Sequence, residues 1–142
     1  MKRAYPTFIA QDGKDFLVYV PDMDIYTEGT DFEDAIAMAR DAIGIAGISM
    51  EDNNEVLPKA SSQANAIAKA KEDTEIFDYS KGILTYIDVD FAEYRRKVDN
   101  KTVRRNVALP SWLDYEAEKA GINVSRVLQE ALMKVLNVSR NM

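Results

Sequence analysis

The sequence predicts an α+β protein in two parts: a front domain with the element order β-β-β-α-(α)-β, and a tail of one strand and two short helices. Two observations support this division. Apolar residues alternate in some short segments and recur every three or four positions in others, as in strands and amphipathic helices respectively. Charge is divided as well. Residues 1–94 hold 8 Lys and Arg against 19 Asp and Glu, a net of −11, whereas residues 95–142 hold 10 against 5, a net of +5. An acidic front and a basic tail indicate two parts with different partners.

The front domain begins with three short strands. Residues 4–11 form the first, and Pro6 gives it an irregular start or places it at a sheet edge, because proline has no amide hydrogen to donate. Asp12-Gly13 suits a tight hairpin into the second strand, residues 16–20, which is rich in aromatic and β-branched side chains. Residues 25–28 form a short third strand.

A long helix follows the third strand. Thr30 and Glu33 have the spacing of a capping box, in which each side chain satisfies a backbone amide at the helix start, and Gly47 can end this helix. A weaker helix begins at Ser61 or Ser62, and residues 83–89 form a fourth strand. We therefore expect a sheet with its helices on one face.

The tail begins with a strand over residues 102–109. Val103, Val107 and Leu109 lie on one face of the alternation, and Thr102, Arg104, Asn106 and Ala108 lie on the other. Such alternation is typical of a half-buried strand. Pro110 ends it, because a proline cannot continue the ladder.

Two short helices complete the tail. Ser111 can cap the first, which Gly121 closes, and Asn123 can cap the second. About 35 residues are too few to bury a core alone, so we expect this unit to pair with a second copy, as a homodimer or a higher even-numbered oligomer. The predicted division is a front domain of residues 1–90, a linker of residues 91–101 that can be partly helical, and a tail domain of residues 102–142.

Composition excludes several classes of function. The chain has no cysteine and no histidine, so it has neither disulfides nor the usual soft ligands for a transition metal, and no metal or other cofactor is expected. No apolar run approaches the roughly 18 residues of a membrane span, and the N-terminal residues do not resemble a signal peptide. We expect a cytoplasmic protein without membrane contact.

Three features of the tail occur together: the alternating strand that ends in Leu109-Pro110, the pair Leu113 and Ala117, and the junction GINVSRVL of residues 121–128. In this combination the tail resembles the ribbon-helix-helix family. That resemblance implies an antiparallel ribbon from two chains that enters the DNA major groove, which is wide enough to admit one. The residues expected at DNA are Thr102, Arg104, Asn106 and Ala108 on the ribbon, and Val124, Ser125 and Arg126 at a helix start that can hold a phosphate.

A second resemblance covers the front domain. Its residues are FLVYVPD at 16–22, YTEGTDFEDA at 26–35 and ARDAI at 39–43, and they look like the HicB antitoxin domain. The resemblance implies a HicA-type, mRNA-cleaving toxin as partner, and repression of the protein's own operon through operator double-stranded DNA. It also implies a degraded ribonuclease H-like fold.

The acidic front domain would speed capture of a basic, RNA-binding toxin. The contacts expected from the second and third strands and their turn are Tyr19, Asp22, Asp24, Tyr26 and Glu28. We expect no enzymatic activity, because the first strand carries none of the carboxylates that a two-metal nuclease needs, although Asp22, Asp24 and Asp88 lie elsewhere in the front domain. The alternative function is a ribbon-helix-helix regulator whose front domain senses a small ligand.

Four basic residues surround the junction of the two parts: Arg95, Arg96, Lys97 and Lys101. They either add sequence-independent attraction for DNA phosphates or only keep the linker solvated.

Overall fold

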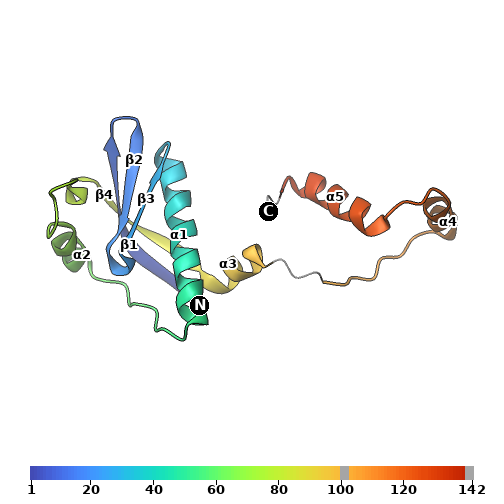
Figure 1. Cartoon of the computed structure of the whole chain (residues 1–142), viewed down its shortest axis with the longest axis horizontal. Helices are drawn as coiled ribbons and strands as arrows, with labels where there is room; N and C mark the ends of the chain where they lie inside the picture. Colours follow the sequence, from blue (N-terminus) through green and yellow to red (C-terminus); the bar gives the residue numbers. More distant parts are fainter. Residues whose placement is uncertain (100–102, 140–142) are drawn as a thin grey trace. The chain divides into compact units, whose positions relative to one another are not determined.

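The computed structural model describes residues 1–99 and 103–139, and these divide into two compact units, Met1–Asn100 and Lys101–Met142 (Figure 1). The first unit contains the strands β1 Lys2–Asp12, β2 Asp15–Val20, β3 Ile25–Gly29 and β4 Ile83–Asp90, the α-helices α1 Phe32–Asp52, α2 Gln63–Ala70 and α3 Phe91–Val98, and the 3-10 turns η1 Pro21–Met23 and η2 Tyr79–Lys81. The second unit contains α4 Ser111–Lys119 and α5 Val124–Leu136. The predicted α+β class and the four front strands are confirmed.

The sheet of the first unit is antiparallel in the order β3-β2-β1-β4. A two-residue turn joins β1 to β2 between the paired residues Asp12 and Asp15, and Gly13 supplies the positive φ of 62° that such a turn requires. The expectation that Pro6 keeps the first strand at an edge is wrong, because β1 is an inner strand. Pro6 is tolerated because it lies in the part of β1 that is paired with β4 alone.

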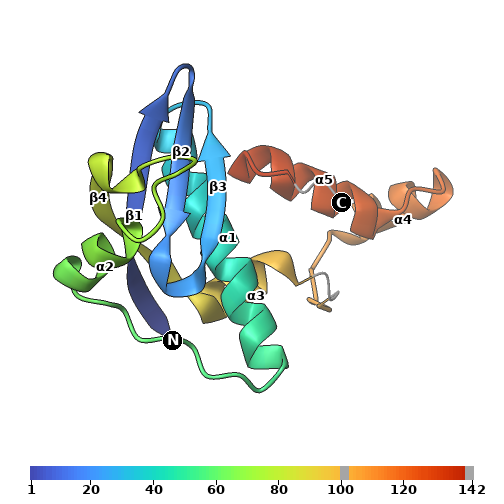
Figure 2. The same cartoon turned by 60° about the vertical axis from the view of Figure 1, so that its left-hand side comes forward.

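Helices cover both faces of the sheet, not one as the sequence predicts (Figures 1 and 2). On one face α1 and α3 bury a larger core of Tyr5, Ile9, Val18, Val20, Ala35, Ala39, Ile43, Leu57, Ile87, Val89, Phe91 and Tyr94. On the other face α2 buries a smaller core of Phe8, Tyr19, Ala66 and Ala70. Alternate side chains of β1 and β2 point to opposite faces, so one inner hairpin contributes to both cores.

The long helix α1 begins one residue later and ends later than the sequence predicts. Asp31 is its N-cap and accepts a hydrogen bond from the amide of Asp34 at 2.7 Å, and the Asp34 carboxylate accepts one from the amide of Thr30 at 2.9 Å. The reciprocal cap therefore joins these residues in place of the predicted pair Thr30 and Glu33. Gly47 does not end the helix, which continues to Asp52.

Residues 91–98, which the sequence assigns to a linker with partly helical character, form the helix α3 and pack against α1 as part of the first unit. Asp90 caps this helix by accepting hydrogen bonds from the amides of Ala92 and Glu93. Phe91 and Tyr94 are buried against α1, and the Tyr94 hydroxyl donates to the Asp41 carboxylate at 2.5 Å. These contacts make α3 part of the first unit.

In the second unit the two predicted helices are confirmed, but Pro110 and not Ser111 is the N-cap residue of α4, and no side chain caps this helix. The predicted strand is not formed. Gly121, with a φ of 67°, follows α4, and the Asn123 side chain caps α5 by accepting from the amide of Arg126 at 3.1 Å. Residues 103–110 form no strand, and Thr102 lies outside the described residues. The physical reason is that a strand requires a neighbouring strand for its hydrogen bonds, and none of the described residues supplies one.

Candidate functional site

An aromatic cluster lies on the face of the sheet that α2 covers only in part. Tyr19 of β2 and Tyr26 of β3 are cross-strand partners, and their rings stack with centroids 4.8 Å apart at an angle of 18°. Tyr79 of η2 lies 5.3 Å from Tyr19 and 5.8 Å from Tyr26, and Phe77 lies edge-on to Tyr79 at 5.0 Å. Four rings from three segments thus form one continuous surface, which we call the aromatic face.

The aromatic face has a buried base and an exposed rim. Tyr19 is 5% exposed, whereas Tyr26 is 63% exposed and the neighbouring Ile76 is 96% exposed. Burial raises the pKa of both Tyr19 and Tyr79, and the nearby Tyr26 hydroxyl adds to the increase, so both phenols stay neutral well beyond neutral pH. The neutral rings of Tyr19 and Tyr79 thus form the base against which the exposed ring of Tyr26 lies.

A shallow hollow of about 180 Å³ lies in the aromatic face. Its lining combines rings with charged side chains from α2 and the loop after it: Tyr19, Tyr26, Lys69, Ala70, Asp73, Ile76, Phe77 and Tyr79. Small-molecule sites usually enclose about 300–1,000 Å³. The hollow is therefore better matched to one side chain of a protein partner than to a separate ligand.

The turn between β2 and β3 is held by its carboxylates. Asp22 accepts hydrogen bonds from the amide and the hydroxyl of Ser61, which ties η1 to the loop before α2. Asp24, in a left-handed conformation, forms an ion pair with Lys69 at 3.0 Å, and Lys69 also donates to the carbonyl of Pro21. These bonds fix the edge of the aromatic face.

A second exposed surface is formed by residues 103–139. Every one of these residues is exposed except Ala117, which is half-buried. The exposed side chains include the single tryptophan, Trp112, and large aliphatic residues along both helices: Leu113, Ile122, Val124, Val127, Leu128, Leu132, Met133, Val135 and Leu136. A single copy of this unit has no buried core within the described residues.

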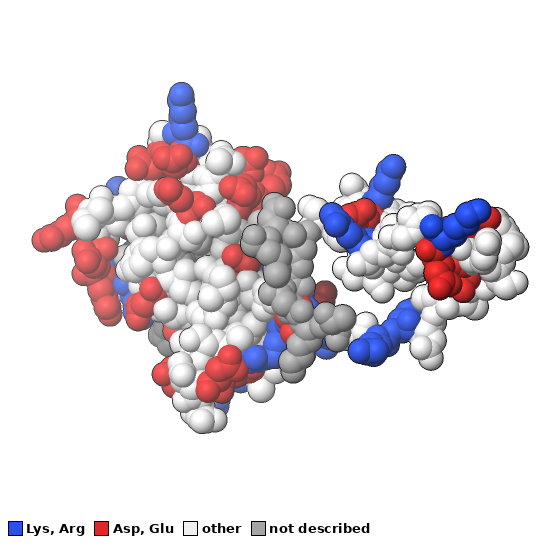
Figure 3. All heavy atoms as spheres, turned by 45° about the vertical axis from the view of Figure 1, so that its right-hand side comes forward, with Lys and Arg blue, Asp and Glu red and all other residues white. Residues whose placement is uncertain are grey.

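Charge separates the two surfaces. Figure 3 shows carboxylates distributed over the visible face of the first unit, whereas Lys and Arg are prominent on the second, beside a smaller group of carboxylates. This agrees with the net charges of −9 for residues 1–100 and +3 for residues 101–142. The aromatic face belongs to the acidic unit, and the exposed helical surface belongs to the basic one.

Comparison with known proteins identifies the family. A family model described as the HicB-like antitoxin of bacterial toxin-antitoxin systems matches residues 5–132, which span both units. The chain belongs to the HicB-like antitoxin family. No curated protein sequence matches it significantly.

Solved structures share the fold of this HicB-like antitoxin. A chain of a toxin-antitoxin complex from Streptococcus pneumoniae is similar with a TM-score of 0.54 and 21% identity, over 94% of this chain and 99% of that one. The antitoxin HicB of Burkholderia pseudomallei is similar with a TM-score of 0.50 and 24% identity, over 95% of this chain and 97% of that one.

The antitoxin's predicted partner-binding residues fall into two groups. Tyr26, Glu28 and Asp24 are exposed, whereas Tyr19 is buried and Asp22 is half-buried and bonded to Ser61. Sequence reasoning missed Ile76, Phe77 and Tyr79, whose only signal is a group of apolar residues within a charged loop. The aromatic face is thus assembled from two neighbouring strands and a segment about 50 residues later in the chain.

The predicted DNA-contacting residues of the antitoxin lie on exposed parts of the second unit. Arg104, Asn106 and Ala108 lie in the stretch 103–110, and Val124, Ser125 and Arg126 form the first turn of α5. Arg126 forms an ion pair with Glu130 one turn later, at 3.2 Å. The predicted contact Thr102 lies outside the described residues.

Neither a metal site nor a membrane span is found in the described part of the antitoxin. Residues 1–99 and 103–139 contain no group of three or more acidic side chains placed to hold a metal ion. Within the same residues no helix is long and apolar enough to cross a membrane.

Proposed function

We propose that this HicB-like antitoxin neutralises a HicA-type, mRNA-cleaving toxin by direct binding, and that it represses its own operon by binding operator DNA as a dimer. The observation that carries the proposal is the exposure of nearly every side chain of residues 103–139, large apolar ones included. Contiguous exposed apolar surface of this kind marks an interface. Since the unit has no buried core of its own, a second copy is the simplest partner.

Pairing of two chains through residues 103–109 accounts for the alternation in that stretch. An antiparallel ribbon would bury Val103, Val107 and Leu109 against the helices and turn Arg104 and Asn106 outward. The major groove admits a two-stranded ribbon, and Arg and Asn are the side chains best matched to guanine and adenine edges. The ribbon would therefore read the operator sequence, and a homodimer or a higher even-numbered oligomer would bind it.

The start of α5 fits a phosphate beside the ribbon. Asn123 uses the amide of Arg126, so the amides of Val124 and Ser125 are the donors that a phosphate can use at this helix start. The Arg126 side chain is exposed and held only by its ion pair with Glu130, a type of surface pair that contributes about 0.3–0.5 kcal/mol. That pair is weak enough for Arg126 to exchange Glu130 for a DNA phosphate.

The aromatic face is the proposed toxin contact. An exposed ring on a buried base is the usual form of an interface hot spot, and Tyr26 has both features because it stacks on Tyr19. Glu28 and Asp24 lie beside it and give the rim negative charge, as expected for the cover of a basic, RNA-binding protein. Asp22 acts indirectly, by holding the turn through Ser61.

We further propose that the antitoxin is not an enzyme. The three carboxylates that a nuclease would require are held by different partners: Asp22 by Ser61, Asp24 by Lys69 and Asp88 by Arg40. Such pairing does not favour joint coordination of Mg²⁺. Mg²⁺-dependent cleavage of an RNA–DNA hybrid by the purified chain, lost in Asp22→Asn, would refute this part of the proposal.

The decisive experiment uses the full chain and the protein encoded beside it. We expect a small basic toxin to co-purify with the antitoxin, and the antitoxin alone to sediment as a dimer and to retard a duplex from its own promoter. Leu132→Asp, which places a charge in the apolar stripe of α5, should give a monomer that no longer binds the duplex but still binds the toxin. The matched control Gln129→Asp adds the same charge on the polar side of α5 and should retain both activities.

Two outcomes would contradict the proposal. A wild-type chain that is an ordered monomer at micromolar concentration would refute dimerisation through the tail. The absence of a neighbouring toxin, together with DNA binding that changes with a small molecule, would instead favour a ligand-sensing regulator.

A further inference from the structure

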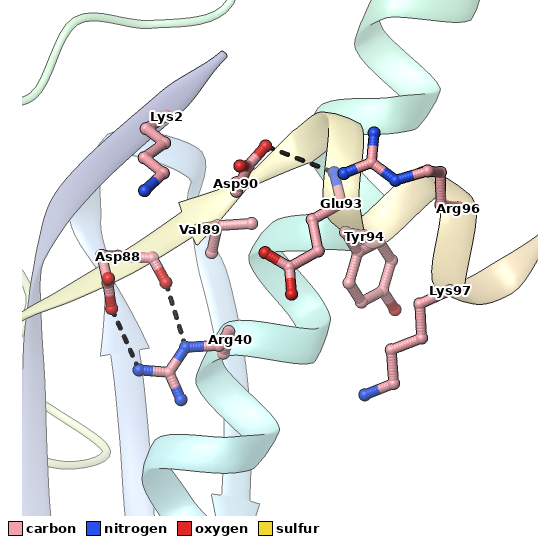
Figure 4. A pocket seen from close by; sticks show the side chains of 9 residues that line it. All are labelled: Lys2, Arg40, Asp88, Val89, Asp90, Glu93, Tyr94, Arg96 and Lys97. Atoms are coloured by element: carbon pink, nitrogen blue, oxygen red, sulfur yellow. Dashed lines mark hydrogen bonds and ion pairs between the residues drawn. The ribbon is translucent and has the colours of Figure 1, made fainter.

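The first unit has one basic groove, beside α3, although the unit as a whole is acidic. Residues 1–100 hold 11 Lys and Arg against 20 Asp and Glu, a net of −9. Four of the cations, Lys2, Arg40, Arg96 and Lys97, line a single open groove of about 680 Å³ (Figure 4). The groove collects side chains from β1, α1, β4 and α3, so the fold and not the local sequence produces it.

Two of the three carboxylates of the groove, Asp88 and Asp90, are already engaged in direct contacts. Asp88 is held by Arg40, whose Nε donates to the Asp88 carbonyl at 3.0 Å and whose guanidinium pairs with the carboxylate at 3.1 Å. Asp90 caps α3. These contacts with the Arg40 guanidinium and with the Glu93 amide hold the pKa values of Asp88 and Asp90, respectively, below their usual range. Both therefore remain charged and bonded.

Three exposed cations of the groove form no direct ion pair within the described residues, although Lys2 lies close enough to Asp88 and Asp90 to help lower the pKa of each carboxyl. Lys2, Arg96 and Lys97 form no ion pair within residues 1–99 and 103–139. The neighbouring Arg95 differs, because it is bound to Glu51 at 3.1 Å and Asp52 at 3.0 Å. Within residues 1–99 and 103–139, Glu93 is the one carboxylate of the groove that forms neither a hydrogen bond nor an ion pair, since Asp88 is bonded to Arg40 and Asp90 to backbone amides. The groove thus offers a net positive charge to an extended anion.

A short stretch of sequence joins this groove to the proposed DNA-binding ribbon. Five residues, 98–102, separate Lys97 from Val103. Six Cα–Cα steps span at most about 20 Å even when fully extended. Duplex DNA carries one phosphate per roughly 1.7 Å of helix axis, so a duplex held by the ribbon presents a dense row of phosphates on either side of that contact.

We propose that Lys2, Arg96 and Lys97 bind the sugar-phosphate backbone of the duplex that the ribbon holds, and so extend the DNA footprint onto the acidic unit. This inference rests on the proposed DNA binding. These three side chains would increase the affinity for DNA without adding sequence preference, because phosphate contacts carry no base information. The proposal also assigns different roles to adjacent basic residues: Arg95 fixes α3 to α1, whereas Arg96 and Lys97 bind DNA.

The test measures how DNA affinity depends on salt. The full chain is titrated by fluorescence anisotropy into its promoter duplex and a scrambled duplex, between about 50 and 200 mM KCl. Each phosphate contact contributes about −0.9 to the slope of log K against log [salt], so six contacts per dimer contribute up to about −5. The variant Lys2→Gln/Arg96→Gln/Lys97→Gln should lose at least about 2 of that slope, with the same preference for the promoter over the scrambled duplex.

The matched control removes the same charge elsewhere in the unit. Lys14, Lys59 and Lys71 are exposed, lie outside the groove, and are replaced together by Gln. This control should keep a slope near that of the wild type. Glu93→Gln is a second test of opposite sign, because removing the unpaired carboxylate of the groove should tighten DNA binding severalfold.

The outcomes distinguish the two proposals. A wild-type chain that binds neither duplex refutes the proposed DNA binding. A wild-type chain that binds, with equal slopes for the groove variant and the control, refutes only the groove. Loss of toxin binding by the groove variant with unchanged DNA affinity would also overturn it, because the groove would then be a protein contact. Circular dichroism with unchanged unfolding midpoints verifies that each variant is folded.

Discussion

The contact between α1 and α3 gives a prediction whose sign opposes that of helix propensity. Gly47 lies within α1, where Ala normally stabilises a helix over Gly by about 0.8–1.0 kcal/mol. A Cβ at this position would lie 2.1 Å from Cε1 of Phe91, 2.6 Å from Cδ1 and 2.8 Å from Cζ. Phe91 is 1% exposed, so its ring has no free space to move into.

The magnitude follows from these two opposing effects. Overpacking a rigid core costs about 1–3 kcal/mol, and a 2.1 Å contact belongs at the upper end of that range. After the propensity gain of about 1 kcal/mol, Gly47→Ala should lower the free energy of unfolding by about 2 kcal/mol. In a Phe91→Ala background the ring is absent, and the same change should raise stability by about 1 kcal/mol. The coupling is therefore about 3 kcal/mol, near the maximum for residues in direct contact.

The assay is urea unfolding of the full chain. The single tryptophan, Trp112, lies in the second unit, whereas six of the seven tyrosines lie in the first, so tyrosine fluorescence reports mainly on the first unit. Ser49→Ala, an exposed position of the same helix, is the matched control and should be neutral or slightly stabilising. If Phe91→Ala, which should cost about 3–5 kcal/mol, leaves the unit unfolded, Phe91→Val serves as the background instead. A Gly47→Ala chain more stable than the wild type would refute the packing of α3 on α1.

Three further predictions concern the site and its scaffold. Tyr26→Ala should weaken toxin binding by at least 2 kcal/mol, measured by calorimetry, without changing the unfolding midpoint, whereas Tyr19→Ala should lower that midpoint because Tyr19 is buried; equal effects of the two on stability would contradict the division into rim and base. Burial and the Asp41 carboxylate raise the pKa of Tyr94 to about 12 in the folded protein, above its unfolded value of about 10. The contribution of the neutral Tyr94 hydroxyl to the free energy of unfolding is therefore complete below pH 10 and is lost as the pH rises from about 10 to about 12. Tyr94→Phe should therefore reduce the alkaline loss of stability in unfolding curves, and an unchanged pH profile would count against it. Arg104→Ala should cost about 1–3 kcal/mol on the operator and relax sequence choice, whereas a loss equal on all sequences would make Arg104 a phosphate contact.

Local patterns predicted the elements of the first unit well because those patterns reflect short-range physics. The hairpin at Gly13 follows from the turn it must make, and the alternation of residues 16–20 follows from a strand with two different faces. The arrangement of the layers was harder to predict. The weak apolar stripe of α2 indicated a helix but not which face it covers, and the second core exists only because β1 and β2 place Phe8 and Tyr19 there.

The candidate site was predictable only where its residues are close in sequence. Tyr19, Tyr26 and Glu28 lie on two adjacent strands, so a hairpin argument brings them together. Tyr79 contacts them from the turn η2, whose position no hydrophobic periodicity in the sequence predicts. The tail presents the opposite case: its apolar stripe was evident from spacing, and its exposure in a single chain is consistent with a missing partner, but dimerisation and the ribbon stay predictions.

The helix α3 shows why some packing leaves no trace in a sequence pattern. Half of its residues, FAEYRRKV, are charged, and it therefore resembles a solvated linker. Its docking depends on Phe91 and Tyr94 lying over Gly47 and Gly44, where a Cβ would be 2.1 Å and 2.7 Å from the rings. The space that receives the two rings exists because glycines have no side chains, so a search for apolar stripes does not detect it. Sequence patterns instead suggest a helix end at such a glycine, as at Gly47. The glycine spacing on one helix and the aromatic spacing on another, both of three residues, become informative only together, because each is the complement of the other.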